Sequence, residues 1–181
     1  AMTKEQQALF MEYAKDSYVY NLFAVMLRTG IRNGEIRGLK YSDVDKKKNV
    51  FHVQRTLKYI EGWGYFEDTP KTRTSKRDIP LTADLVVLLD AQRNYWDFKV
   101  ERLDHYLFCN EKGEPLSRDR LQAEIDRIVK CIQAEGHDFP RITPHIFRHT
   151  FATRAIEAGM PPQVLKTILG HSSLAMTMDL Y

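Results

Sequence analysis

The chain has 181 residues, of which 43% are hydrophobic and 28% are charged, and its formal net charge is +3. This length and composition predict one soluble globular domain with a sizeable core. No apolar run approaches the roughly 20 residues that cross a bilayer, so we expect no membrane segment. The two cysteines, Cys109 and Cys131, are too few for a disulfide framework and lack metal-ligand spacing, which favours a reducing, cytoplasmic environment.

The first part of the chain predicts two helices followed by short strands. Residues 15–30 carry apolar side chains at helical spacing and end at Gly30, a typical C-terminal cap. A short helix is expected within 33–44. The hydrophobic period then changes to the alternation that is typical of strands. These strands are expected at 49–57, 63–69 and 76–81.

The remainder of the chain predicts helices separated by loops. Thr82 and Thr143 stand where a helix N-cap is expected, and Pro144 occupies the favoured first helical position. The expected helices cover 82–103, 118–136, 143–159, 161–170 and 172–181. The expected fold is therefore α+β and mostly helical, with one small antiparallel three-stranded sheet near the N-terminal third.

Residues 71–77 form the strongest local charge feature. Their sequence, KTRTSKR, contains no acidic residue, and its cations are Lys71, Arg73, Lys76 and Arg77. Such a run is either the solvated tip of a hairpin or a patch that binds phosphate groups. Its composition alone does not separate the two readings.

The segment HIFRH places His145 and Arg148 on one face of a predicted helix. His149 follows His145 at the spacing of the zinc motif HExxH. That motif needs a glutamate after its first histidine, and Ile146 stands there instead, so we expect no metal site. For His149 a structural place in the helix is favoured over a catalytic one. A histidine beside an arginine suits an anion whose charge grows during a reaction.

Two further segments are unremarkable when each is taken alone. In TGIRNGE, Arg32 directly follows a predicted helix, with Glu35 placed to orient it, which would ordinarily be a helix cap with a surface ion pair. His171 follows Gly170 at a predicted helix junction. Neither segment identifies a site by itself.

Taken in order, these segments resemble the catalytic domain of the tyrosine recombinases, the integrases of phages and conjugative transposons. The matching segments are TGIRNGEIRGL, PKTRTSKRDIPL, TPHIFRHTFAT and LGHSSLAMTMDLY, and they cover nearly the whole chain. The resemblance places the family's catalytic residues on Arg32, Lys71, His145, Arg148, His171 and Tyr181. The tyrosine follows its histidine one residue later than in many members, a spacing similar to that of transposon-type integrases.

The resemblance implies a reaction that needs neither metal nor cofactor. Tyr181 would attack a DNA phosphodiester, giving a 3′-phosphotyrosyl enzyme and a 5′-hydroxyl that a partner strand can replace. His145 is the candidate acceptor of the tyrosine proton. Lys71 would protonate the leaving 5′-oxygen, with Lys76 as the alternative if the hairpin register differs.

The same resemblance implies how the developing charge is stabilised. Arg32 and Arg148 would clamp the two non-bridging oxygens as the phosphorane gathers charge. His171 would donate a further hydrogen bond to the same group. We expect each of these roles because the residue stands at the position that matches the family pattern.

The resemblance also implies partners and domain limits. Double-stranded DNA would bind mainly through phosphate contacts, with Arg73, Lys76 and Arg77 as the expected DNA-binding residues. Residues 1–181 correspond to the catalytic domain, so the N-terminal DNA-binding domains and a C-terminal tail are expected to be absent. We expect this domain alone to be a monomer and the full-length protein to form a tetramer on DNA.

Three alternative functions stay open at this point. A type IB topoisomerase would use the same chemistry without a partner strand. A DNA-binding regulator with a silent site is disfavoured because the whole residue set is intact, and a metal-dependent nuclease would form no covalent complex in EDTA. A strand-joining assay separates the recombinase from the topoisomerase.

Overall fold

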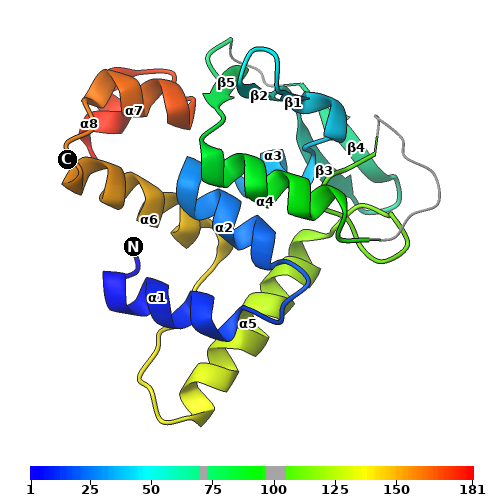
Figure 1. Ribbon diagram of the computed structural model, residues 1–181, viewed down its shortest axis with the longest axis vertical. Helices are drawn as coiled ribbons and strands as arrows, with labels where there is room; N and C mark the ends of the chain where they lie inside the picture. Colours follow the sequence, from blue (N-terminus) through cyan, green and yellow to red (C-terminus); the bar gives the residue numbers. More distant parts are fainter. Residues whose placement is uncertain (70–72, 97–104) are drawn as a thin grey trace.

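The structure is a computed structural model that describes residues 1–69, 73–96 and 105–181 (Figure 1). The helices are α1 (Lys4–Tyr13), α2 (Tyr20–Thr29), α3 (Asn33–Arg37), the 3-10 helix η1 (Tyr41–Asp43), α4 (Ala83–Arg93), α5 (Arg118–Ala134), α6 (Pro144–Glu157), α7 (Pro162–Leu169) and α8 (Leu174–Met178). The strands are β1 (Val44–Asp45), β2 (Val50–Val53), β3 (Thr56–Ile60), β4 (Gly64–Asp68) and β5 (Arg77–Pro80). The expected α+β, mostly helical fold is confirmed. Within the described ranges, no helix combines the length and apolar character needed to cross a bilayer.

The central helix is α2, which contacts α1, α4 and α6 (Figure 1). Its buried side chains are Leu22, Phe23, Ala24, Val25, Met26, Leu27 and Thr29. A helix that is apolar around most of its circumference is stable only when other elements cover it on most sides. It is capped by Gly30 in the left-handed conformation, with φ of 65°, as the sequence predicts.

Three phenylalanines join α1, α2 and α6 inside the core. The rings of Phe23 and Phe147 stack with their centroids 5.1 Å apart, and Phe10 meets these rings edge-on at 5.2 and 5.3 Å. Aromatic pairs of this kind contribute about 0.5–1.5 kcal/mol beyond the burial of their area. Because Phe147 directly precedes Arg148, the cluster also fixes where α6 presents that arginine.

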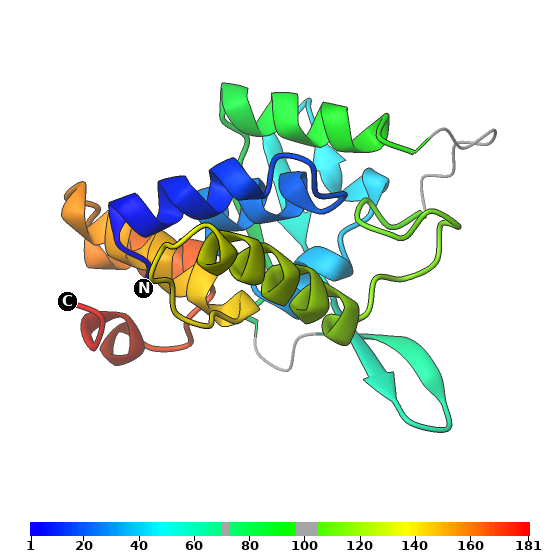
Figure 2. The same cartoon turned by 90° about the horizontal axis from the view of Figure 1, so that it is seen from below.

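A three-stranded antiparallel sheet is present, in the order β1-β2-β5. Its third strand is β1, and the predicted strand over 63–69 lies outside this sheet. Phe51 pairs with Ile79 in the β2–β5 register, and both side chains are buried in the core. β3 and β4 form a separate hairpin, which projects from the body of the molecule in Figure 2. Trp63, in the turn of this hairpin, is 89% exposed.

The prediction of one continuous strand over 49–57 is wrong, because the chain leaves the sheet after Val53. The cause is the buried carboxylate of Asp43 in η1. It accepts a hydrogen bond from the guanidinium of Arg55 at 2.5 Å and another from the amide of Gln54 at 2.9 Å. These contacts draw the two polar side chains toward η1, so the backbone bends and the next strand joins the hairpin.

Two helices also differ from the sequence prediction. α4 ends at Arg93, earlier than residue 103, and the next three residues form turns, while 97–103 lie outside the described residues. α1 is absent from the predicted elements. Thr3 and Gln6 form a capping box at its start, a signal that is readable in the sequence as TKEQ.

A second, smaller apolar cluster joins α6, α7 and the residues that follow α8. Its buried members are Phe151, Ala152, Ala155, Leu165 and Leu169, and Leu180 packs against them. In Figures 1 and 2, α8 lies at the periphery, next to α7. The end of the chain is therefore held by this cluster and is separate from the main core.

Candidate active site

Arg148 projects from α6 to the C-terminal ends of two other helices. Its Nη1 donates to the carbonyl of Gly30, after α2, at 2.6 Å, and its Nη2 donates to the carbonyl of Leu169, in α7, at 2.8 Å. Carbonyl groups at a helix C-terminus lack helical partners and carry partial negative charge, so a guanidinium stabilises both ends. These bonds use only part of the donors of the buried guanidinium, and the other N–H groups can serve a further acceptor.

Glycine is required where these two helices end. Gly30 and Gly170 have φ of +65° and +70°, a conformation that L side chains rarely adopt. A Cβ atom at Gly170 would lie 2.8 Å from Nη1 of Arg77, and one at Gly30 would collide with the ring of Phe151. The backbone therefore approaches its neighbours more closely than a side chain would permit.

Glu35 lies buried beside these helix ends and pairs with Arg77 of β5. The Nη2 and Nη1 atoms of Arg77 lie 2.8 and 3.1 Å from the two carboxylate oxygens, and each side chain is 3% exposed. Burial by itself raises the pKa of Glu35. The hydrogen bonds and charges of Arg77 and Arg32 outweigh burial, so the pKa lies below the usual value of a glutamate.

The expectation that Arg77 contacts DNA is corrected by this arrangement. Besides its bonds to Glu35, its Nη1 donates to the carbonyl of Ser75 at 2.8 Å and its Nε donates to the carbonyl of Ile168 at 2.7 Å. A guanidinium whose nitrogens all bond inside the protein does not reach a phosphate at the surface. The strand alternation that buries Ile79 also buries Arg77, and this signal could have separated Arg77 from the exposed cations.

Arg32 stands at the N-cap of α3 and is also held by Glu35. Its Nη1 lies 3.0 Å from one carboxylate oxygen, and its backbone N–H donates to the other oxygen at 3.1 Å. The expected orienting ion pair is therefore present. The Arg32 side chain is 38% exposed, so its guanidinium is accessible to a ligand.

Arg32, Arg77 and Arg148 form a group that we call the arginine cluster. Glu35 is the one carboxylate that pairs with it among the described residues, so its three positive charges meet a single negative charge. Burial and the charges of the other two arginines lower the pKa of Arg148 to about 9, which still leaves it protonated at neutral pH. An anion bound here would offset this repulsion, so the cluster is suited to bind one.

His171 adds a neutral polar group to the arginine cluster. Burial and the charges of the three arginines lower its pKa to about 4, so the imidazole is uncharged near pH 7. Its Nδ1 lies 2.9 Å from the hydroxyl of Thr177 in α8. Thr177 is not among the sequence candidates, because a single threonine in a predicted helix gives no signal of a site.

His145 is exposed in the first turn of α6, one turn before Arg148. No hydrogen bond to its side chain is found within the described part of the chain. Burial lowers the pKa of the half-buried His149, and the charges of the N-terminal amine and of His145 lower it further. The structure therefore brings Arg32, Arg148 and His171 together and leaves His145 facing solvent.

Tyr181 forms its hydrogen bond outside the arginine cluster. Its hydroxyl donates to the carbonyl of Met160, in the connection between α6 and α7, and the residue is 49% exposed. Leu180 anchors this segment by packing on the smaller apolar cluster. The hydroxyl must leave Met160 before it can meet an anion held by the arginine cluster.

The cations of the basic run 71–77 differ in their exposure. Arg73 and Lys76 are exposed in the segment that precedes β5, as a phosphate-binding patch requires. Lys71 lies outside the described residues. Arg77, as shown above, is the member of the run that turns inward.

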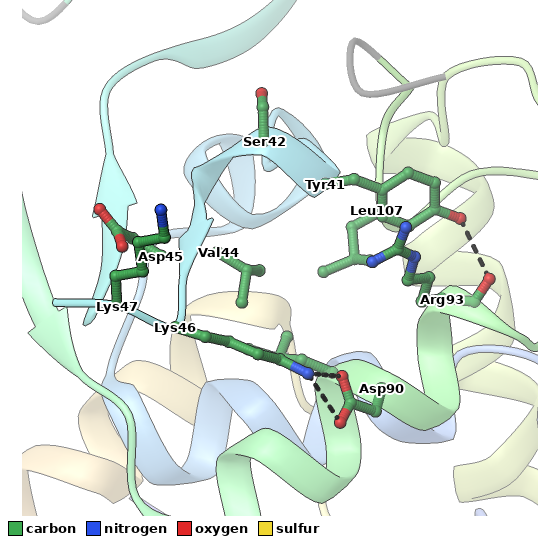
Figure 3. Close-up of a pocket in the computed structure, with 10 residues that line it drawn as sticks. Tyr41, Ser42, Val44, Asp45, Lys46, Lys47, Asp90, Arg93 and Leu107 are labelled. Atoms are coloured by element: carbon green, nitrogen blue, oxygen red, sulfur yellow. Dashed lines mark hydrogen bonds and ion pairs between the residues drawn. The ribbon is translucent and has the colours of Figure 1, made fainter. Parts of the chain in front are cut away.

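A pocket on another part of the molecule lies between β1 and α4 (Figure 3). The Nζ of Lys46 lies 2.9 Å from a carboxylate oxygen of Asp90, and the hydroxyl of Tyr41 donates to the carbonyl of Arg93 at 3.4 Å (Figure 3). Among the described residues, none of the site residues predicted from the sequence lines this pocket. The arginine cluster is therefore the candidate site.

Comparison with known proteins gives one family. The chain matches the phage integrase family over residues 1–181. It is 30% identical to the transposase from transposon Tn916 of Enterococcus faecalis, over 99% of the chain and 47% of that protein. It is 29% identical to a XerC-like tyrosine recombinase of Caldanaerobacter subterraneus, over 88% of the chain and 44% of that protein.

A solved structure shares the fold. The Tn1549 transposon integrase in complex with circular intermediate DNA superposes with a TM-score of 0.88 at 30% identity, over 99% of this chain and 61% of the solved one. The chain spans about half the length of the curated relatives described above.

The buried ion pair of the site predicts a pH-dependent effect of Glu35→Gln. At pH 7 the variant should lose about 3 kcal/mol of unfolding free energy, because Arg77 stays buried without its ionic partner. The lowered pKa of Glu35 means that this stabilisation is complete above about pH 4.3, the unfolded value, and is lost as the pH falls through the folded value. Denaturant unfolding between pH 7 and 3 should therefore show the wild type and variant converging in acid.

The matched control is Glu12→Gln, which removes an exposed pair with Lys15. This control should change the free energy by less than about 1 kcal/mol at any pH. A gap between wild type and Glu35→Gln that stays constant down to pH 3 would contradict the assignment.

Proposed function

The chain belongs to the phage integrase family, and on that premise we propose that it is the catalytic domain of a site-specific DNA recombinase. This enzyme cuts and rejoins double-stranded DNA through a 3′-phosphotyrosyl intermediate. The relatives are named transposases and recombinases, and solved relatives are bound to DNA, which favours this function over a type IB topoisomerase or a silent regulator.

The observation that carries the proposal is the unbalanced charge of the arginine cluster. Three guanidiniums and one carboxylate leave two positive charges in a largely buried setting, and the neutral His171 adds a donor. A phosphodiester carries one negative charge, and its pentacoordinate transition state carries a second. Preorganised donors placed where this charge develops stabilise the transition state more than the ground state.

In the proposed first step, the phenolic oxygen of Tyr181 forms a bond to phosphorus while the bond from phosphorus to the 5′-oxygen breaks. Arg32 and Arg148 hold the non-bridging oxygens, and Arg148 keeps its position through the carbonyls of Gly30 and Leu169. This step requires the Tyr181 hydroxyl to exchange its bond to Met160 for the phosphate.

Two proton transfers accompany the step. A phenol has a pKa of about 10, so the nucleophile needs a base, and His145 on the exposed turn before Arg148 is the proposed acceptor. The leaving 5′-oxygen takes a proton from Lys71, with Lys76 as the alternative. In the second step, a 5′-hydroxyl of a partner strand attacks the phosphotyrosine, and each proton returns by the reverse path.

The proposed DNA contacts outside the site come from Arg73 and Lys76, which are exposed beside β5. Such phosphate contacts make binding depend strongly on salt and little on sequence. We propose further that residues 1–181 act as a monomeric domain alone, and that the full-length cytoplasmic protein acts as a tetramer on DNA. The chemistry is proposed to need no metal ion, because the arginines supply the positive charge.

Replacement of Tyr181 by phenylalanine tests the proposed reaction. The protein that carries this chain should form a covalent adduct with attachment-site DNA in the presence of EDTA, and Tyr181→Phe should abolish the adduct while binding stays within a few-fold. Denaturing gel electrophoresis measures the adduct, and a gel-shift assay measures binding. An adduct that persists in the variant assigns another nucleophile, and an adduct that needs a divalent metal contradicts the proposed chemistry.

A sulfur-substituted substrate distinguishes the two lysines. Lys71→Ala should cleave normal DNA slowly and recover when sulfur replaces the bridging 5′-oxygen, because a thiolate leaves without a proton. Lys76→Ala is the matched variant and should show no such recovery. Single-turnover cleavage rates on the two substrates provide the measurement, and recovery of Lys76→Ala alone would move the general acid to that residue.

A further inference from the structure

Thr177 differs from other threonines in the helices of this protein. The hydroxyls of Thr29, Thr150, Thr153 and Thr167 each donate to the backbone carbonyl four residues earlier. The hydroxyl of Thr177 instead lies 2.9 Å from Nδ1 of His171, and the residue is completely buried. Its bond is therefore directed at a side chain of the candidate site.

The burial of Thr177 decides the direction of this hydrogen bond. If Nδ1 of His171 carried the proton, the threonine hydroxyl would accept it, and the hydroxyl's own hydrogen would have no acceptor among the described residues. A buried donor without a partner is destabilising. If the hydroxyl donates to the lone pair of Nδ1, both groups are satisfied. The second arrangement is therefore favoured.

We propose that Thr177 is a positioning residue that donates to Nδ1 of His171, holds the imidazole with its proton on Nε2, and thereby directs the Nε2–H at the bound phosphate. The identity of the phosphate rests on the proposed function, whereas the position of the proton does not. A neutral imidazole has one N–H, so fixing Nδ1 as the acceptor decides which nitrogen donates.

The electrostatic setting supports the neutral imidazole on which this device depends. Burial and the positive charges of Arg148, Arg32 and Arg77 hold the pKa of His171 to about 4, so protonation does not override the tautomer near neutral pH. These arginines are the charged groups that act on the ring. They also repel a second ring proton that would otherwise turn Nδ1 into a donor.

The same bond connects α8 to the site. Thr177 lies one turn before Tyr181, and its hydroxyl is the link from α8 to His171 among the described side-chain hydrogen bonds. When α8 is docked, the Thr177 hydroxyl holds the His171 ring so that its Nε2–H points at the phosphate. When α8 shifts, the ring loses this hydrogen bond. The position of α8, which precedes Tyr181, is thereby coupled to the orientation of the Nε2–H donor of His171.

The direct test is the position of the proton on His171, measured by 15N NMR of the histidine rings of the 181-residue chain without DNA. The wild type should show a protonated Nε2 and an unprotonated Nδ1 whose resonance carries the shift of an accepted hydrogen bond. Thr177→Ser should keep this pattern, and Thr177→Val should lose the Nδ1 shift. Thr167→Val, which removes a hydroxyl from α7 that bonds only to its own helix, is the control and should leave the ring unchanged.

A wild-type spectrum with the proton on Nδ1 would overturn the inference, as would a Thr177→Ser ring that differs from wild type. Neither result requires a cleavage assay or the valine variant to fold. In cleavage assays, Thr177→Val should be slowed by about 10- to 100-fold, the range for removing a group that orients a functional histidine. Serine should restore the rate. Absence of cleavage in the wild type, with the proton on Nε2, would contradict the proposed function and leave the inference standing.

Discussion

The structure depends on one electrostatic constraint, which is that three guanidiniums lie close together with only Glu35 to oppose them among the described residues. The carboxylate pairs with the buried Arg77 and with the accessible Arg32, while Arg148 relies on backbone carbonyls. Such carbonyls supply partial charge only, so the cluster keeps an excess of positive charge. A site of this kind is costly when empty and favourable when an anion fills it.

The fold keeps the cluster together by bringing helix ends to it. The C-terminal carbonyls after α2 and in α7 converge on Arg148, and the positive φ of Gly30 and Gly170 allows the close approach. The stacked rings of Phe23 and Phe147 hold α2 and α6, the helix that carries Arg148, against each other. The main core therefore supports Arg148, whereas the segment that carries Tyr181 packs on a smaller cluster at the periphery. This division preorganises the arginine cluster and leaves Tyr181, the proposed nucleophile, next to the smaller cluster.

The sequence predicted the family and the fold class, because these depend on ordered motifs and on hydrophobic period. It placed β2 and β5 in one antiparallel sheet but also assigned to that sheet the strand over 63–69, which pairs with β3 instead. Gly30 and Pro144 mark helix ends by local chemistry and were placed correctly. The predictions failed where a tertiary contact outweighs the local pattern. The single strand over 49–57 breaks at the buried Asp43, and Arg77, predicted as a surface cation, pairs inside with a residue far along the chain. Thr177 was missed because its partner is identified only by the fold.

In the proposed reaction, Arg32 acts on the negative charge of a phosphate oxygen, so a substrate without that charge should not depend on Arg32. Cleavage rates are compared for a normal scissile phosphate and for a methylphosphonate, in which a methyl group replaces one charged oxygen. Arg32→Ala should slow cleavage of the normal substrate by roughly 100-fold or more but change the rate on the neutral substrate only a few-fold. Arg28→Ala, at an exposed ion pair with Asp84, should alter neither rate. Equal losses for Arg32→Ala on both substrates would contradict the account.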